Sequence, residues 1–387
     1  MNKLKFLSGL LIALLLSQIN VFAQQQQKKV LASLPMKSRG LTPAVEVTVN
    51  GKGPFLFAVD TGAQGKARVD ISLMKRLDMK AVGQRRAGDG SGQNARMLDV
   101  VKIDSLKIGE LEFRDVEAVT RDYNSSPNLT KIDGVIGFNL LAEYLLTLDF
   151  PAKQIRIETG ELPPATSGNN ILNFENPNGV PVVELQIGSQ KVKADIDSGN
   201  MVGGFMLPTA VVEKLNLAGQ PVVVGRAGTV SSEIEIKQVR LKDSIRLGGF
   251  EFAEPTVSFP ALSIANIGAP AMQDFLFTFD QKNKRLKLEK SKTAATKPIV
   301  KIENLKDYSG VYGERRISDE GGNLYLQRGT NGMRLLMVAL PAAKDEFTLE
   351  LVPDARLRFV RNAAGKITEI EILTPAGNWE KARRSDK

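Results

Sequence analysis

The sequence contains no histidine and no cysteine in 387 residues. The missing histidine excludes every Ser-His and Cys-His mechanism and removes the commonest metal ligand. The missing cysteine excludes disulfides, thiol chemistry and a lipid anchor attached through a thiol. Any hydrolytic chemistry must therefore depend on carboxylates, lysine or tyrosine.

Long hydrophobic runs are scarce as well, and the longest lies at the N-terminus. Two lysines precede an apolar run from Phe6 to Leu16, and Val21 to Ala23 supplies the small residues that a signal peptidase reads. The run is too short to span a membrane, so the pattern predicts a secretory signal peptide over residues 1–23, cut before Gln24. We expect a monomer in the periplasm or outside the cell, with no stable membrane insertion after cleavage.

The formal charge of +9 is the feature that suggests a nucleic-acid partner. The export signal argues against such a partner, and the basic residues are spread along the chain, with the densest stretch from Lys282 to Lys301 in what resembles a tail and linker. A solvated basic surface explains the charge better, and no nucleic-acid partner is expected. A hydrophobic content of 42% at this length allows two or three domains with their own cores.

One stretch of nine residues, Phe55 to Ala63 (FLFAVDTGA), carries the strongest functional signal. Its apolar run delivers Asp60 to a sharp turn at Thr61 and Gly62, which places the carboxylate at a surface or cleft. A single copy means little, because Asp, Thr and Gly are ordinary turn residues. However, Val192 to Asn200 (VKADIDSGN) repeats the same form around Asp197.

The elements around the two acids recur in the same order and with nearly the same spacing. The pairs are Val45–Val49 with Val182–Ile187, a helix capped by Asp70 with a helix over Pro208–Leu217, Ile108-Gly109 with Leu247-Gly248, the triplet ending at Gly137 with that ending at Gly268, and the hairpin Leu145–Phe150 and Gln154–Glu158 with Phe275–Asp280 and Arg285–Glu289. Chance similarity would not keep five features in register. The chain is predicted to be mainly β, with similar lobes at 29–160 and 170–290 and a linker over Leu162–Asn170.

If a pseudo-twofold axis brings the two turns together, Asp60 and Asp197 form a carboxylate dyad. Two like charges about 3 Å apart cannot both ionise readily, so they share one proton. The ionised acid takes a proton from water while the protonated acid donates to a carbonyl, which hydrolyses an amide without metal or cofactor. Thr61 and Ser198 would hold the turns through their hydroxyl groups, and Gly62 and Gly199 would let the backbone crowd the site.

These residues resemble the pepsin and retropepsin-like aspartic proteases, over about Val45 to Glu289. The resemblance is carried by the two acid turns, with Ala63 completing the first, and by the apolar-apolar-Gly triplets. It implies two β lobes around a peptide-binding cleft, each lobe giving one Asp, with Gly137 and Gly268 behind the catalytic turns. The shared proton is likewise a property of that family. The short lobes are closest to a fused pair of retropepsin units.

Two departures from the family's pattern stand out. Asn266 begins the second triplet where the first has Val135, and Tyr123 lies too near Ile132 to act as a flap tyrosine. The tract Ala87–Gln93 is either a flexible surface loop or a mobile hairpin over the cleft. The candidate flap residues are Gly88, Asp89, Gly90, Ser91 and Gly92.

The C-terminal part, 300–387, is predicted to be an accessory β-rich domain behind a linker over Ser291–Pro298. Its candidate strands are Leu324–Gln327, Leu335–Val338, Phe347–Leu351, Leu357–Val360 and Ile367–Leu373. It contains no cluster of acids or ligands with motif spacing. Trp379 is either a binding aromatic or an anchor in the core or at an edge.

Three functions remain open from the sequence. The first is a secreted aspartic endopeptidase that uses Asp60 and Asp197 on a peptide or protein substrate. The second is a peptide-binding module on the same fold without turnover, which the intact acid turns disfavour. The third is another carboxylate hydrolase such as a glycosidase, against which the aromatic content of 6% argues.

Overall fold

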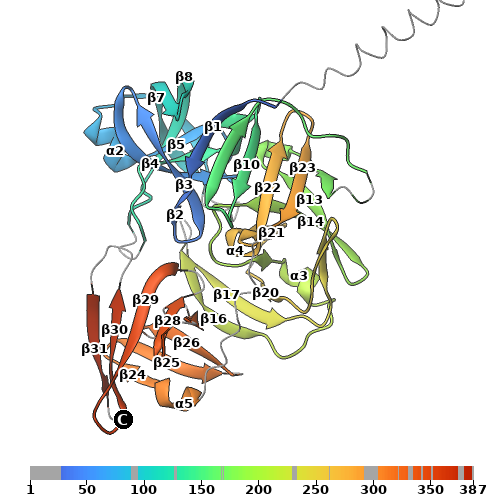
Figure 1. Ribbon diagram of the computed structural model, residues 1–387. Coiled ribbons are helices and arrows are strands. Elements are labelled where there is room, and N and C mark those ends of the chain that lie inside the picture. Colours follow the sequence, from blue (N-terminus) through green and yellow to red (C-terminus); the bar gives the residue numbers. More distant parts are fainter. Residues whose placement is uncertain are drawn as a thin grey trace, which may run out of the picture.

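The computed structural model describes residues 28–88, 95–125, 129–166, 168, 170–228, 233–260, 262–291, 304–320, 322–329, 334–340, 343–349, 352–373 and 379–385. The predicted signal peptide, residues 89–94 of the glycine-rich region and residues 292–303 lie outside these ranges. The described chain is built mainly of strands, which form three sheets and a closed barrel, so the predicted mainly β class is confirmed (Figure 1). No helix among the described residues has the length and apolar character needed to cross a membrane.

The first lobe is an eight-stranded sheet in the order β2-β3-β4-β9-β5-β8-β7-β6. Its strands are β2 (Lys37–Arg39), β3 (Thr42–Val49), β4 (Lys52–Asp60), β5 (Ala67–Asp70), β6 (Ala81–Ala87), β7 (Arg96–Ile108), β8 (Leu111–Arg121) and β9 (Gly134–Gly137). The hairpin of β3 and β4 turns at Asn50 and Gly51, whose φ angles of 51° and 73° suit a tight two-residue turn. Helix α2 (Ile71–Arg76) begins as predicted, because the Asp70 side chain accepts from the Ser72 amide at 2.8 Å.

The second lobe repeats this sheet. Its strands are β13 (Val182–Ile187), β14 (Gln190–Asp197), β15 (Phe205–Met206), β16 (Val222–Gly228), β17 (Glu233–Arg240), β18 (Ile245–Leu247), β19 (Phe250–Phe252), β20 (Thr256–Ser258) and β21 (Ala265–Gly268). Their order, β16-β17-β20-β15-β21-β14-β13-β18-β19, matches the first lobe read from its other edge. The long strands β7 and β8 each correspond to two shorter strands here. The predicted second helix is shorter than expected, since α3 covers Thr209–Val212, and α4 (Ala269–Met272) follows β21.

The two predicted closing hairpins are present, but they do not close the lobes separately. They form one six-stranded sheet, β1-β11-β10-β22-β23-β12, in which β10 pairs with β22 across the lobes. Its strands are β1 (Val30–Pro35), β10 (Leu145–Asp149), β11 (Gln154–Glu158), β12 (Ile171–Asn173), β22 (Phe275–Asp280) and β23 (Arg285–Lys290). Two 3-10 turns, η1 (Phe138–Leu141) and η2 (Pro177–Gly179), lie beside it in sequence.

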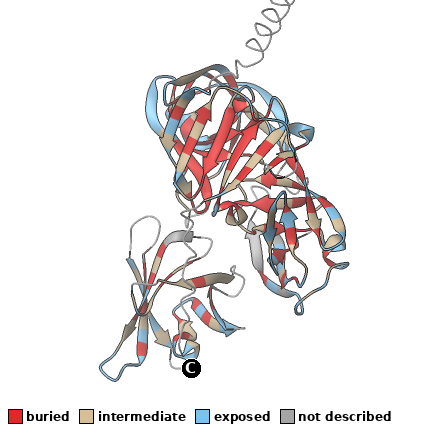
Figure 2. Ribbon diagram, turned by 45° about the vertical axis from the view of Figure 1, so that its right-hand side comes forward, coloured by how far each residue is buried: buried red, intermediate tan, exposed pale blue. Residues whose placement is uncertain are grey.

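Both lobes share one hydrophobic core, which includes this joining sheet (Figure 2). Phe138 of the first lobe packs edge to face on Phe279 of β22 at 5.3 Å, and the buried Thr147 and Thr278 hydroxyls hydrogen bond at 3.0 Å. The predicted linker also begins inside this body, since the buried Leu162 donates its amide to Asp280 at 2.9 Å. The lobes are therefore fixed to each other by packing as well as by chain connection.

The C-terminal part is a closed eight-stranded barrel with a separate core. It contains α5 (Leu305–Tyr308), β24 (Gly310–Tyr312), β25 (Arg315–Glu320), β26 (Asn323–Arg328), β27 (Arg334–Ala339), β28 (Glu346–Leu349), β29 (Val352–Arg361), β30 (Ile367–Leu373) and β31 (Trp379–Ser385). The five predicted strands are confirmed as far as they are described, with residues 350 and 351 of one of them outside the described ranges, whereas β24, β25 and β31 were not predicted. Trp379 is at the surface, 46% exposed, with the Arg358 guanidinium 5.4 Å from its ring centre.

Candidate active site

Each predicted acid lies at the end of a strand in the middle of its lobe's sheet. Asp60 ends β4 and Asp197 ends β14, and each strand runs parallel to the strand that carries the glycine triplet. In that pairing Asp60 lies opposite Gly137 and Asp197 lies opposite Gly268. The backbone then turns at once, because Ala63 donates to Asp60 O at 3.2 Å and Asn200 donates to Asp197 O at 3.1 Å.

The hydroxyl groups of Thr61 and Ser198 tie the two turns together. The Thr61 amide donates to Ser198 Oγ and the Ser198 amide donates to Thr61 Oγ1, both at 3.0 Å. Thr61 Oγ1 donates to Ile196 O at 2.6 Å, and Ser198 Oγ donates to Val59 O at 2.7 Å. Both side chains are fully buried. Four hydrogen bonds therefore cross between the lobes directly beneath the two acids.

The turn glycines let each acid pack against the opposite turn. A Cβ atom on Gly62 would stand 2.4 Å from Cγ of Asp197, and a Cβ atom on Gly199 would stand 2.4 Å from Cγ of Asp60. No side chain fits at that distance without moving the carboxylate. The reciprocal contacts show that the structure brings Asp60 and Asp197 together, within hydrogen-bonding reach of each other.

Gly137 and Gly268 lie behind the turns, as the resemblance implies. A Cβ atom on Gly137 would stand 2.4 Å from Gly65 O and 3.0 Å from Ala63 O. A Cβ atom on Gly268 would stand 2.3 Å from Gly203 O. Both positions require glycine, because the chain that follows each acid passes directly over them.

The two carboxyl groups differ in their surroundings. Asp60 accepts from the Gly62 amide at 2.9 Å, whereas Asp197 accepts from the amides of Gly199 (2.9 Å) and Asn200 (3.1 Å) and from Asn266 Nδ2 (3.1 Å). Burial, followed by the negative charge of Asp197, raises the pKa of Asp60 to about 7, although the positive charge of Arg68 opposes the rise. More hydrogen-bond donors therefore point at Asp197 than at Asp60. The arrangement therefore keeps the shared proton on Asp60.

Asn266 has a larger part in the site than the sequence suggested. Its polar side chain departs from the family's pattern, yet it donates to Asp197 and accepts from Asn200 Nδ2 at 2.6 Å. It thus links the acid to the end of its own turn. The comparison with Val135 in the first triplet pointed to the position but not to the contact.

Two charged residues near the dyad were not predicted. Asp195 lies two residues before Asp197 and faces Asn266 in the pairing of β14 with β21; its pKa is raised to about 7, mainly by burial and then by the charge of Asp197. Arg68 in β5 lies close enough to lower the pKa of Asp60. The alternation of side chains along a strand would have placed Asp195 on the face of Asp197.

The candidate flap is only partly described. Strands β6 and β7 form the expected hairpin, and Gly88 at its end accepts from the Arg121 guanidinium. Asp89, Gly90, Ser91 and Gly92 lie outside the described residues. Tyr123 packs in the small cluster that contains Ile132, on the side of the sheet next to the acid turn.

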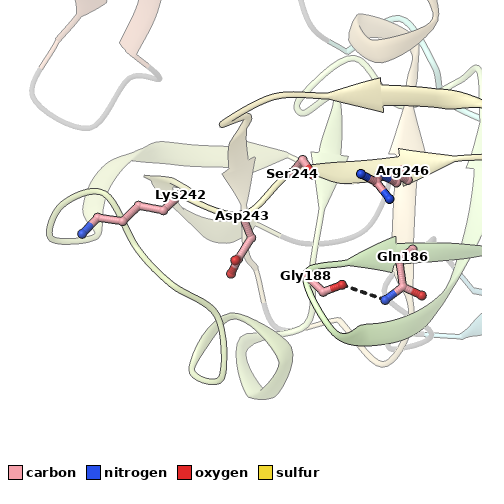
Figure 3. Close-up of a pocket in the computed structure, with 6 residues that line it drawn as sticks. All are labelled: Gln186, Gly188, Lys242, Asp243, Ser244 and Arg246. Atoms are coloured by element: carbon pink, nitrogen blue, oxygen red, sulfur yellow. Dashed lines mark hydrogen bonds between the residues drawn. The ribbon is translucent and has the colours of Figure 1, made fainter.

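A polar hollow lies elsewhere on the second lobe (Figure 3). It is formed by the turn after β13 and the chain just before and within β18, and Gln186 Nε2 donates to Gly188 O at 2.8 Å within it. Its lining residues are Gln186, Gly188, Lys242, Asp243, Ser244 and Arg246. None of them belongs to the acid turns, so this hollow is separate from the dyad.

Comparison with known proteins agrees with this geometry. Residues 45–140, which contain the first acid turn and Gly137, match the family described as aspartyl protease. A search of curated proteins finds no match for the chain. The fold and the site together define a mainly β protein with an aspartyl protease domain and a closed C-terminal barrel.

Proposed function

We propose that this protein is an aspartic endopeptidase of the two-lobed pepsin and retropepsin-like type. The observation that carries the proposal is the reciprocal packing of Asp60 on Gly199 and of Asp197 on Gly62. Two carboxyl groups packed this closely repel each other when both are ionised, which favours one shared proton and supports the proposed mechanism. The family match covers the first lobe only, and the second lobe supports the proposal through its equivalent turn.

The asymmetry of the dyad assigns a role to each acid. Asp197, whose carboxyl group accepts three hydrogen bonds, takes a proton from the attacking water. Asp60 keeps its proton up to about pH 7 and donates it to the carbonyl oxygen of the scissile bond. When the tetrahedral intermediate breaks down, the proton on Asp197 passes to the leaving amine nitrogen, and the carbonyl re-forms by returning its proton to Asp60. No net proton is gained or lost by the dyad.

The same geometry disfavours the other two functions. A glycosidase needs its two carboxyl groups at least about 5 Å apart, to admit a sugar or a water between them. Here the acids lie within hydrogen-bonding reach of each other. A binding module without turnover would not require a carboxyl group with a pKa of about 7 facing a second carboxyl group.

The test is replacement of each acid by its amide. Asp60→Asn and Asp197→Asn should each remove nearly all cleavage of an unstructured protein such as casein, and the double variant should be no worse, because the two acids act as a unit. Circular dichroism should show that all three variants fold. Either single variant that still cleaves would contradict the dyad, and a parent protein that binds peptides without cleaving them would identify a binding module.

We further propose that the protein is exported and acts as a monomer on peptide or protein substrates, with the barrel as an accessory domain. The motivation for export is the N-terminal run from Phe6 to Leu16 with Val21 to Ala23 behind it. Mass spectrometry of the mature protein should find Gln24 as its first residue. Retention of residues 1–23 would contradict export by signal cleavage.

A further inference from the structure

Strand pairing places one basic residue, Arg68, on the face of the first-lobe sheet that carries Asp60. Ala58 of β4 pairs with Val135 of β9, and Val135 pairs with Arg68 of β5, so these three form a row across the sheet. The next row on the same face, two residues along, contains Asp60 and Gly137. Side chains separated by two residues in a strand point to the same side. Arg68 therefore faces the same side of the sheet as Asp60.

The second lobe has a different row at the equivalent position. There Asp195 of β14 pairs with Asn266 of β21, and Asn266 pairs with Met206 of β15. Met206 thus takes the place of Arg68, and it packs in a small apolar cluster with Val224 and Ile236. The two lobes consequently differ at this position beside the dyad: the first lobe has the guanidinium of Arg68, and the second lobe has the thioether of Met206.

Arg68 is partly buried and carries its charge close to the reacting groups. Burial opposes its charged form, but Tyr123 and both acids of the dyad outweigh that effect and raise the pKa of Arg68. The Tyr123 hydroxyl is buried beside the guanidinium. Arg68 therefore stays charged at every pH at which the dyad works.

Arg68 forms no ion pair among the described residues, although its side chain interacts with the Tyr123 hydroxyl and with the charges of the two acids. Other arginines with little exposure are engaged: Arg39 donates to Tyr123 O, and Arg315 pairs with Glu380. A cation taken partly out of water gains much from a carboxylate, because the local dielectric is low and the guanidinium offers two parallel donors. Arg68 thus offers a cation beside the dyad to an anionic ligand.

We propose that Arg68 is a specificity-determining residue that selects substrates with a carboxylate group next to the scissile bond. The proposal rests on the proposed endopeptidase function and adds the substrate class. An Asp or Glu side chain on one side of the cleaved bond would meet the guanidinium, whereas the buried Met206 at the equivalent position of the second lobe supplies no charge. A free C-terminal carboxylate offers the same chemistry, so the test must distinguish these two sources.

The first experiment compares matched peptides at pH 6. Each pair differs only by Glu or Gln at one of the two positions that flank the cleaved bond, and a further pair carries a C-terminal acid or amide. One charge-assisted hydrogen bond predicts at least about a tenfold preference in kcat/KM for Glu at one internal position. A preference confined to the C-terminal acid would overturn the internal-residue proposal in favour of an exopeptidase. Equal cleavage of all pairs by the parent protein would overturn the proposal altogether.

Variants then attribute the preference to Arg68. Arg68→Met copies the residue of the second lobe and should bring the Glu to Gln ratio close to 1, whereas Arg68→Glu should favour a Lys peptide. Arg246→Met, on the exposed hollow of the second lobe, is the matched control and should keep the parent ratio. If Arg68→Met lowers kcat for every peptide equally and leaves the ratio unchanged, Arg68 only adjusts the dyad and the proposal fails.

Direct binding separates this proposal from the endopeptidase function. In Asp197→Asn, where no cleavage is expected, fluorescence anisotropy should show tighter binding of the Glu peptide than of the Gln peptide. Adding Arg68→Met should remove that difference. Absence of any cleavage by the parent protein, with the binding difference intact, would refute the protease alone. Cleavage without any charge preference would refute the role of Arg68 alone.

Discussion

Replacing Thr61 by valine tests how far the joined turns hold the site together. Valine has nearly the same shape as threonine, but it cannot accept from the Ser198 amide or donate to Ile196 O. Both of these backbone groups would be left unsatisfied at a fully buried position. Each such group costs about 1–3 kcal/mol, so the free energy of unfolding should fall by about 2–6 kcal/mol.

The measurements are the free energy of unfolding in urea, monitored by far-UV circular dichroism, and kcat on a peptide substrate. Because the same bonds place Asp60 against Asp197, kcat should fall by about a hundredfold, the size of loss that a small misplacement of reacting groups produces. Thr61→Ser keeps the hydroxyl group and should retain most of the stability and activity. Thr120→Val, which removes one bond of 3.2 Å to Asp99 O far along the sheet, is the control for losing a buried hydroxyl.

The reasoning would be refuted if Thr61→Val unfolded like the Thr120→Val control and kept the parent kcat. In that case the hydrogen bonds between the turns would be a consequence of the fold and would not hold the dyad. Loss of stability without loss of kcat would show that they hold the lobes together but do not set the geometry of the acids.

Three further predictions concern pH, the turn glycines and the barrel. The pKa of Asp60 is about 7 in the folded chain and near 3.8 in the unfolded chain, so between these pH values the folded state holds an extra proton. The free energy of unfolding should therefore fall as pH rises from about 4 to 7, and the fall should be smaller in Asp60→Asn. The value of kcat/KM should decline above about pH 7, where Asp60 loses its proton. A flat stability profile would contradict this assignment. Gly199→Ala places a methyl group 2.4 Å from Asp60 Cγ and should lower kcat by about a hundredfold or more, whereas Gly83→Ala, where no atom lies within 4 Å, should be neutral. A chain that ends at Ser291 should fold and cleave peptides like the full chain, because the barrel has its own core; an insoluble or inactive product would assign the barrel a structural or substrate role.

The repeat allowed much of the fold to be predicted from sequence. Local patterns were sufficient for the hairpin at Asn50 and Gly51, the helix capped by Asp70 and the strands around each acid. The pairing of β10 with β22 left no such signal, because its two strands are far apart in the chain and each also reads as half of a local hairpin. Strands β25 and β31 were missed because charged side chains fill much of both, and closure of a barrel stabilises them.

The sequence repeat singled out the candidate site residues that occur in both halves, and it passed over those that occur in one half only. The acids, the hydroxyl residues and the four glycines occur in both halves, so comparing the halves singled them out. Arg68 and Asp195 each occur in one half only, opposite Met206 and Ala58, and a search for shared features passes over such residues. Their importance depends on which side chains share a face of the sheet, and that requires the register of strands from distant parts of the chain.

The pairing of β10 with β22 also has a consequence for the order of events during synthesis. A ribosome releases the chain from its N-terminus, and 131 residues separate Thr147 from its partner Thr278. Until β22 has emerged, β10 has an open edge and the two lobes are not joined through this sheet. The nascent chain therefore passes most of its synthesis with this edge of β10 unpaired, and the two lobes can be fixed to each other only after β22 has been made.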